Sequence, residues 1–185
     1  MHLIPATLPG TVVIESVVHG DARGFFMETY REEALAAAGI RERWVQDNHA
    51  RSARGVLRGM HFSVDPGQAK LVRCARGRVL DVVVDVRRAS PTFGRWEGVE
   101  LDDVSGRQLY VPRGFAHGYY VLSEVADVVY KCSEYYDPAK ERSIAWDDPD
   151  VGIEWPDGER LLSERDRRAP RLAEIADALP FVYEG

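Results

Sequence analysis

The feature that most constrains this chain is a run of short β-strand patterns between Trp44 and Ser133, punctuated by glycine and proline. Its clearest member is Leu80–Val86, where the even-numbered aliphatic residues share one face and Asp81, Val83 and Asp85 share the other. Many short strands at near-regular spacing favour a sandwich, a jelly roll or a barrel over alternating βαβ units.

Shorter patterns complete the predicted layout. Further strands are predicted at residues 12–18, 25–30, 71–75, 94–101, 108–111, 118–122 and 128–134, with a turn at 19–24. A capping box at Thr29–Glu32 predicts a short helix from Glu33 to Ala38, stopped by Gly39. Apolar residues at helical spacing between Pro170 and Pro180 predict a C-terminal helix at about 171–179.

Composition limits the class of protein. The 185 residues, 45% hydrophobic and 29% charged, fit a single domain over 1–185 with a sizeable core. The formal net charge of −6 argues against a nucleic-acid partner, which needs a basic face, but allows a small anion in a cleft. We expect no membrane partner and a cytoplasmic protein, because no segment resembles a membrane span or a signal peptide. Cys74 and Cys132 lack metal-type spacing and are predicted to be small buried side chains.

One basic segment concentrates the groups that could carry chemistry. Arg54, Arg58, His61 and Lys70 lie close together in a stretch that otherwise has a β pattern. Imidazole is the side chain best suited to proton abstraction near pH 7. An isolated histidine is more often structural, but the flanking cations favour a site at His61. A lysine at a strand end is usually solvated; if Lys70 points inward, it could stabilise a developing oxyanion.

A second histidine, His117, lies in a turn framed by proline and glycine. The spacing Gly-x5-Pro-x-Gly-x-x-His over 106–117 resembles the second motif of the cupin superfamily. Metal-binding cupins add an H-x-H pair, which is missing after His61, so a catalytic metal is disfavoured. The aspartates of Leu80–Val86 would need a cationic or hydrogen-bonding partner if they face inward, and His117 and Lys70 are the candidates.

Two residues far along the chain could complete an acid–base site. Tyr130 lies in a strand pattern, where an aromatic barrel-wall residue is the simpler interpretation; facing His61 across a pocket, it could act as an acid. Asp166 could orient and polarise a histidine, as carboxylates do in His–carboxylate dyads, although a solvated loop acid is the simpler interpretation.

The motifs taken together resemble those of one family, the dTDP-4-dehydrorhamnose 3,5-epimerases. They follow in order from about Gly10 to Pro170, nearly the whole chain. They are Gln46-Asp-Asn48-His, Gly55-Val-Leu-Arg58-Gly-Met-His61-Phe, Gln68-Ala-Lys70-Leu-Val, Asp81-Val-Val-Val-Asp85-Val-Arg87, Ser90-Pro-Thr-Phe-Gly94, Pro112-x-Gly-Phe-Ala-His117-Gly and Leu162-Ser-x-x-Asp166.

The resemblance implies a fold and an activity. The fold would be mainly β, a cupin-type jelly roll or double-stranded β-helix with a few short helices. The protein would be a homodimer that exchanges N-terminal strands, with no metal and no other cofactor. It would invert C3 and C5 of dTDP-4-dehydro-6-deoxy-D-glucose to give dTDP-4-dehydro-L-rhamnose. Both C–H bonds are α to the C4 ketone, so each proton loss makes an enolate that needs a nearby donor.

Residue roles follow from the matched motifs. His61 would be the base with Asp166 as its dyad partner, Tyr130 the acid on the opposite face, and Lys70 the group facing the C4 oxygen. The residues implied to bind the nucleotide-sugar are Arg23, Glu28, Gln46, Asn48, Arg58, His117, Glu141 and Arg165. Tyr136, with Phe25 or Phe26, would stack on thymine. Part of the nucleotide contact would come from the N-terminal strands of the neighbouring subunit.

Two departures keep alternatives open. The family often has Leu-His-Tyr-Gln where this chain has Met60–Ser63, and Arg165 stands where lysine is common. A mono-epimerase acting at C3 or C5 alone, or a ketoisomerase on a related dTDP-keto-sugar, is therefore an alternative. A metal-dependent cupin is a weaker alternative because the H-x-H pair is missing. A non-catalytic sugar-binding module is also weaker, because it would not need His61, Tyr130 and Asp166 together.

Overall fold

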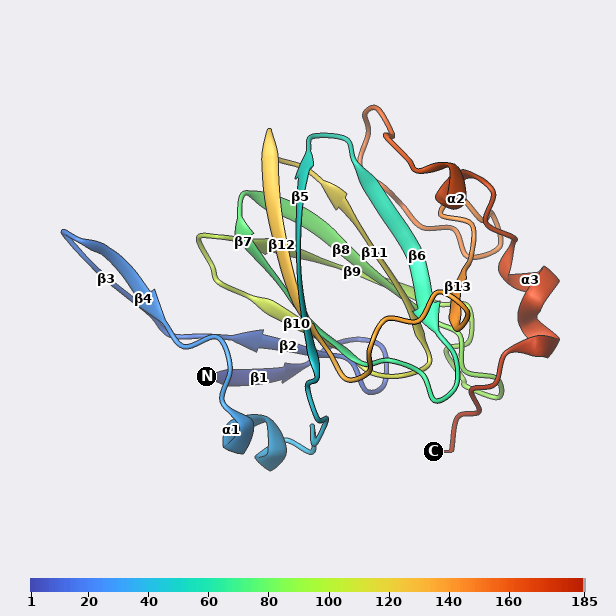
Figure 1. Ribbon diagram of the computed structural model, residues 1–185, viewed down its shortest axis with the longest axis horizontal. Coiled ribbons are helices and arrows are strands. Elements are labelled where there is room, and N and C mark those ends of the chain that lie inside the picture. The colour runs from blue at the N-terminus through green and yellow to red at the C-terminus, as the bar shows by residue number, and fades with distance from the viewer. Residues whose placement is uncertain (185) are drawn as a thin grey trace.

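Two antiparallel sheets face each other in the computed structural model, which describes residues 1–184 (Figure 1). The strands of the first sheet, in spatial order, are β1 (His2–Pro5), β2 (Val12–Glu15), β10 (Gln108–Val111), β7 (Lys70–Arg76), β12 (Val125–Cys132) and β5 (Gln46–Ala53). Those of the second sheet are β13 (Glu141–Ser143), β6 (Leu57–Ser63), β11 (Phe115–Val121), β8 (Arg78–Asp85) and β9 (Trp96–Asp102). From β5 to β8 and from β10 to β13 the chain alternates between the sheets, which confirms the predicted jelly roll.

The period-2 pattern of β8 explains how the sheets pack. Val79 and Val83 join the core between the two sheets, with Leu109 and Phe115 among their neighbours. The even-numbered aliphatic residues face outward into a second apolar cluster, which the C-terminal segment covers through Leu172. The predicted assignment of the two faces is therefore confirmed, and both faces of this strand are buried.

The N-terminal part differs from the sequence expectation. The pattern at 12–18 divides into β2 and β3 (Val18–Asp21), and β3 pairs with β4 (Gly24–Met27) in a hairpin that contains the predicted turn. This hairpin extends away from the body of the protein (Figure 1) and leaves Val18, Phe25 and Phe26 exposed. A strand alternation can be read from the sequence, but a break between two sheets within that alternation cannot.

The helices are short. Helix α1 (Glu32–Ala37) has Arg31 at its N-cap without a side-chain cap, so the capping box predicted at Thr29 is wrong. The Gln108 amide donates a hydrogen bond of 2.8 Å to the Thr29 carbonyl, which ties this residue to β10 instead. Gly39, at φ +86°, does follow the helix end as predicted.

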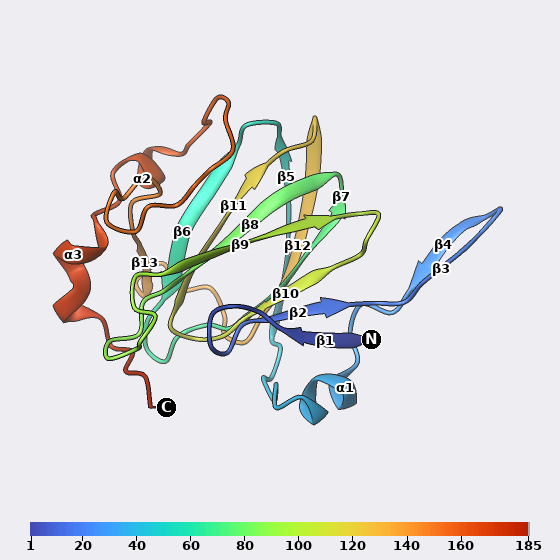
Figure 2. The same ribbon diagram turned by 180° about the vertical axis from the view of Figure 1, so that it is seen from behind.

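The C-terminal segment runs over the outer face of the second sheet (Figure 2). It contains α2 (Glu164–Arg167), α3 (Leu172–Ile175) and a 3-10 turn, η1 (Ala176–Ala178). The helix predicted at about 171–179 is thus two consecutive short turns. Cys74 and Cys132 are buried and free, as predicted. Within residues 1–184, no helix is long and apolar enough to cross a membrane.

Candidate active site

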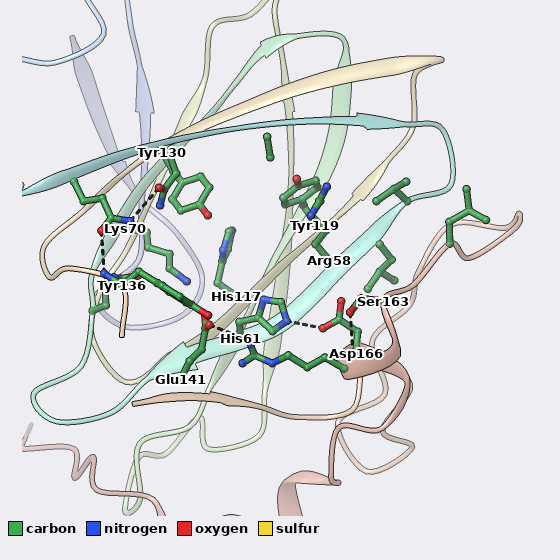
Figure 3. A pocket seen from close by; sticks show the side chains of 18 residues that line it. Arg58, His61, Lys70, His117, Tyr119, Tyr130, Tyr136, Glu141, Ser163 and Asp166 are labelled. Carbon is green, nitrogen blue, oxygen red and sulfur yellow. Dashed lines mark hydrogen bonds and ion pairs between the residues drawn. The ribbon is translucent and has the colours of Figure 1, made fainter. Parts of the chain in front are cut away.

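A cavity of about 510 Å³ opens between the two sheets at the end near α2 (Figure 3). Its walls come from β5, β6, β7, β11 and β12, and from the segment that carries α2. The residues lining it include eleven that the sequence singled out: Gln46, Asn48, Arg58, His61, Lys70, His117, Tyr130, Tyr136, Glu141, Arg165 and Asp166. The fold therefore brings together residues that are more than a hundred positions apart in the chain.

A histidine–aspartate dyad forms one side of the cavity. His61 Nε2 lies 2.6 Å from Asp166 Oδ1, and Asp166 is only 4% exposed. Asp166 is placed by α2, whose first turn is capped by Ser163: the Ser163 hydroxyl oxygen accepts a hydrogen bond of 3.1 Å from the Asp166 backbone N–H. Burial pushes the pKa of Asp166 upward, but the hydrogen bond and charge of His61 hold it below its ordinary value. An ionised carboxylate therefore faces the imidazole.

Two cations in the cavity have no carboxylate partner among residues 1–184. Lys70, the first residue of β7, is buried, and burial lowers its pKa. Arg58 on β6 donates one hydrogen bond of 3.2 Å from Nε to the Ser52 hydroxyl oxygen, and it makes no salt bridge with any of residues 1–184. Unpaired cations in a cavity favour an anionic ligand or a developing negative charge.

Tyr130 belongs to β12 in the first sheet, opposite the sheet that carries His61. Figure 3 shows its hydroxyl pointing into the cavity. Burial raises the pKa of Tyr130 to about 12. The phenol is therefore protonated near neutral pH and can donate a proton from the side of the cavity opposite the dyad.

A second histidine–aspartate pair lies deeper in the site. His117 Nε2 is 2.9 Å and 3.0 Å from the two carboxylate oxygens of Asp81, and both residues are buried. Of the two candidate partners, His117 and Lys70, it is therefore His117 that binds Asp81. Asp85 is satisfied instead by Arg87, Ser90 and Thr92, away from the cavity.

Polar side chains form the rim. The Gln46 amide donates a hydrogen bond of 3.0 Å to Asn48 Oδ1, and its oxygen accepts one of 2.9 Å from the Tyr136 backbone N–H. Arg165 Nη1 donates to Glu141 Oε2 at 2.9 Å. These contacts fix the polar atoms of the rim and leave the Tyr136 ring exposed, as a stacking surface must be.

Four predicted residues lie outside the cavity of this one chain. Arg23, Phe25 and Phe26 belong to the β3–β4 hairpin or its turn, and Glu28 follows it. Arg23 pairs with Asp21 and Glu28 with Arg31. Figure 1 shows the reason, since the hairpin extends away from the two sheets that enclose the cavity.

Sequence reasoning missed three polar residues that line the cavity. Gln68 donates a hydrogen bond of 2.8 Å to the Glu134 carbonyl and so anchors the segment before Tyr136. Ser163 caps α2, and the pattern Ser-x-x-Asp166 could have indicated it. Tyr119 lies two residues after His117, so strand alternation could have placed it on the same face.

The fold and the cavity define a class: cupin-type jelly rolls equipped for acid–base chemistry beside an anionic ligand. Within residues 1–184, no group of three or more His, Cys, Asp and Glu side chains is arranged to hold a metal ion.

Comparison with known proteins identifies the family. Residues 5–174 match the family model described as dTDP-4-dehydrorhamnose 3,5-epimerase, and the chain belongs to this family. It is 48% identical to a Shigella flexneri protein of that name over 90% of this chain and 93% of the relative. It is 47% identical to a Streptomyces niveus dTDP-4-dehydrorhamnose 3-epimerase over 96% of this chain and 87% of the relative.

Solved structures agree. A Legionella pneumophila dTDP-6-deoxy-D-glucose-3,5-epimerase, solved with dTDP-4-keto-L-rhamnose, superposes with a TM-score of 0.96 at 44% identity and covers 100% of this chain and 99% of that one. The predicted family and fold are thereby confirmed.

Proposed function

We propose that this protein inverts C3 and C5 of dTDP-4-dehydro-6-deoxy-D-glucose to give dTDP-4-dehydro-L-rhamnose. The observation that carries the proposal is the His61–Asp166 dyad in one cavity with Lys70 and Tyr130. Such a cavity holds a base, an acid and a cation around one ligand. Family membership supplies the substrate class.

Proton removal is the first step. C3–H and C5–H are acidified by the C4 ketone, and neutral His61 takes one of these protons through the ring atom that is free of Asp166. The ionised Asp166 stabilises the imidazolium that forms, as a carboxylate does in other His–carboxylate dyads. The electron pair moves to the C4 oxygen, where the Lys70 ammonium offsets its charge without a metal.

Reprotonation from the other face completes each inversion. Tyr130 lies in the opposite sheet and is protonated near neutral pH, since its pKa is raised to about 12 by burial. It donates its proton to the enolate carbon on the side away from His61. Before the second centre reacts, His61 releases the proton it took to solvent and Tyr130 regains one from solvent. A base fixed on one face cannot return the proton to the opposite face of an enolate that is held in place, so two groups are required.

The substrate's diphosphate fits the remaining groups. Arg58 supplies an unpaired guanidinium for phosphate oxygens, and Arg165, held by Glu141, supplies a second. Gln46, Asn48 and His117 offer hydrogen bonds along the same cavity. Tyr136 stacks on thymine from the rim.

The exposed β3–β4 hairpin supports a homodimer. Phe26 is 72% exposed and Phe25 is 59% exposed at the end of an arm that has no apolar cover within residues 1–184. We propose that this arm reaches the cavity of a second copy, where Arg23 and Glu28 contact the nucleotide and a phenylalanine packs on thymine opposite Tyr136. The enzyme is a cytoplasmic one in this proposal.

The departure at Met60–Ser63 places no changed side chain in the lining of the cavity. Met60 and Phe62 face the outer apolar cluster, where the ring of Phe62 packs against that of Phe181. Neither Phe62 nor Ser63 lines the cavity that contains His61. The relative named as a 3-epimerase keeps inversion at C3 alone as the second candidate.

A direct assay tests the proposal. The purified protein is incubated with dTDP-4-dehydro-6-deoxy-D-glucose and EDTA, and ¹H NMR follows the appearance of dTDP-4-dehydro-L-rhamnose. We expect full conversion to the equilibrium mixture with the wild type and none with His61→Ala. Accumulation of a product inverted at C3 alone would select the second candidate, and the absence of any product would refute both.

A further inference from the structure

One buried polar group in the cavity has no role in the chemistry described above. Tyr119 is on β11, two residues after His117, so both side chains point to the same face of the strand. It lines the cavity and is 4% exposed, and its hydroxyl makes no hydrogen bond within residues 1–184. More than nine in ten buried polar groups have a partner, so an unpaired one calls for an explanation.

The surroundings of Tyr119 indicate what its partner is. Burial raises the pKa of Tyr119, while the Arg58 guanidinium and the Ser52 hydroxyl, which lies near the phenol without the geometry of a hydrogen bond, oppose that shift. The phenol is therefore a proton donor at neutral pH. Figure 3 shows the Arg58 side chain next to the Tyr119 ring, both reaching into the cavity.

Arg58 is itself held weakly. Its one hydrogen bond, 3.2 Å from Nε to Ser52 Oγ, goes to a neutral acceptor, and the side chain is exposed. An anion in the cavity would attract the guanidinium away from Ser52 and toward itself. That movement would uncover the adjacent phenol, whose oxygen is buried in the free protein, and bring it within reach of the same anion.

We propose that Tyr119 is a further substrate-binding residue, whose hydroxyl donates a hydrogen bond to the phosphate oxygen that Arg58 binds. The inference rests on the proposed function, since it takes a nucleoside diphosphate as the ligand of Arg58. A phosphate oxygen can accept from a guanidinium and a phenol together. The unpaired hydroxyl of the free protein is thus a binding group that becomes satisfied only in the complex.

The next residue offers a matched control. Tyr120 points to the other face of β11, outside the set that lines the cavity, and its hydroxyl donates a hydrogen bond of 3.1 Å to the Glu159 carbonyl. Tyr119→Phe removes a hydroxyl that is unpaired in the free protein. Tyr120→Phe removes the same atom from a hydroxyl that is already paired.

The two variants should behave in opposite ways. Isothermal titration with dTDP should show about tenfold weaker binding by Tyr119→Phe and unchanged binding by Tyr120→Phe, because a hydrogen bond to a charged group is lost only in the first. The Tm of the free protein should be unchanged or higher for Tyr119→Phe and about 2 to 4 °C lower for Tyr120→Phe. Thymidine, which has no phosphate, should bind equally to the wild type and Tyr119→Phe.

Each other outcome has a distinct meaning. Equal dTDP affinity of the wild type and Tyr119→Phe would refute the inference and leave the proposed function intact. An equal loss of affinity for thymidine and dTDP would also refute it, since the damage would then not involve the phosphate. A wild type that fails to bind dTDP would refute the proposed function itself.

Discussion

Replacing Asp166 by asparagine tests the dyad most sharply. The substitution keeps the size of the side chain and removes the negative charge that lies 2.6 Å from His61. Asp166 is 4% exposed, so water cannot replace the lost interaction with the imidazolium formed during proton removal. Leaving one partner of a buried charge pair alone costs about 3 to 5 kcal/mol. At about 1.36 kcal/mol per factor of ten, kcat should fall by about 150-fold to several thousand-fold.

Stability should change with pH in a defined direction. The pKa of Asp166 in the folded protein is below its ordinary value of 3.8, so the ionised carboxylate stabilises the fold above that pH. This contribution is lost as the pH falls through the folded-state pKa. Asp166→Asn should therefore have a lower Tm than the wild type at pH 7, and the difference should shrink as the pH falls below 3.8.

Asp85→Asn is the matched control. Asp85 is also buried with a lowered pKa, but its partners are Arg87, Ser90 and Thr92, remote from the cavity. The Asp85→Asn variant should be less stable than the wild type at pH 7 and should keep the wild-type kcat. Initial rates measured by NMR and thermal melts distinguish the two variants. If Asp166→Asn retained more than a tenth of the wild-type kcat, the reasoning about the dyad would be wrong.

Four further predictions follow from the site. Lys70→Met should lower kcat by about 150- to 900-fold, the effect of losing an oxyanion donor worth about 3 to 4 kcal/mol. The Tm of this variant should rise, because the substitution removes a buried cation that has no carboxylate partner in the described residues. A lower Tm would contradict that reasoning. Tyr130→Phe should keep the exchange of substrate protons with solvent and lose net inversion, so inversion at the wild-type rate would rule out its role as acid. Ser163→Ala should lower kcat more than it changes KM, because the lost cap loosens Asp166. Ser163→Thr should restore kcat, since the hydroxyl alone caps α2. Failure of threonine to restore kcat would exclude this positioning role. Phe26→Asp should shift the protein from dimer to monomer in sedimentation equilibrium and raise KM for the substrate, whereas a wild type that sediments as a monomer would refute the proposed exchange of arms.

The sequence was sufficient where a local pattern determines the structure. The period-2 alternation of Leu80–Val86 defined two faces of β8, and both pack as predicted. The same rule places His61 on the cavity side and Phe62 on the outer side.

The convergence of distant residues was beyond local patterns. His61 and Asp166 are 105 positions apart, and only the path of the C-terminal segment over the second sheet brings them together. The resemblance to a family supplied that pairing, because composition alone suggested a solvated acid. Likewise, the sequence showed apolar residues at 25–30 but not that this hairpin leaves the body of the protein.

Solvent exchange measures the central claim most directly. The wild type is incubated with dTDP-4-dehydro-6-deoxy-D-glucose in D₂O, and NMR follows the protons at C3 and C5. A base on one face and an acid on the other, acting α to the C4 ketone, predict deuterium at both carbons, and His61→Ala should abolish it. Deuterium at only one carbon would contradict the double inversion, and the retention of both protons would contradict proton abstraction by this site altogether.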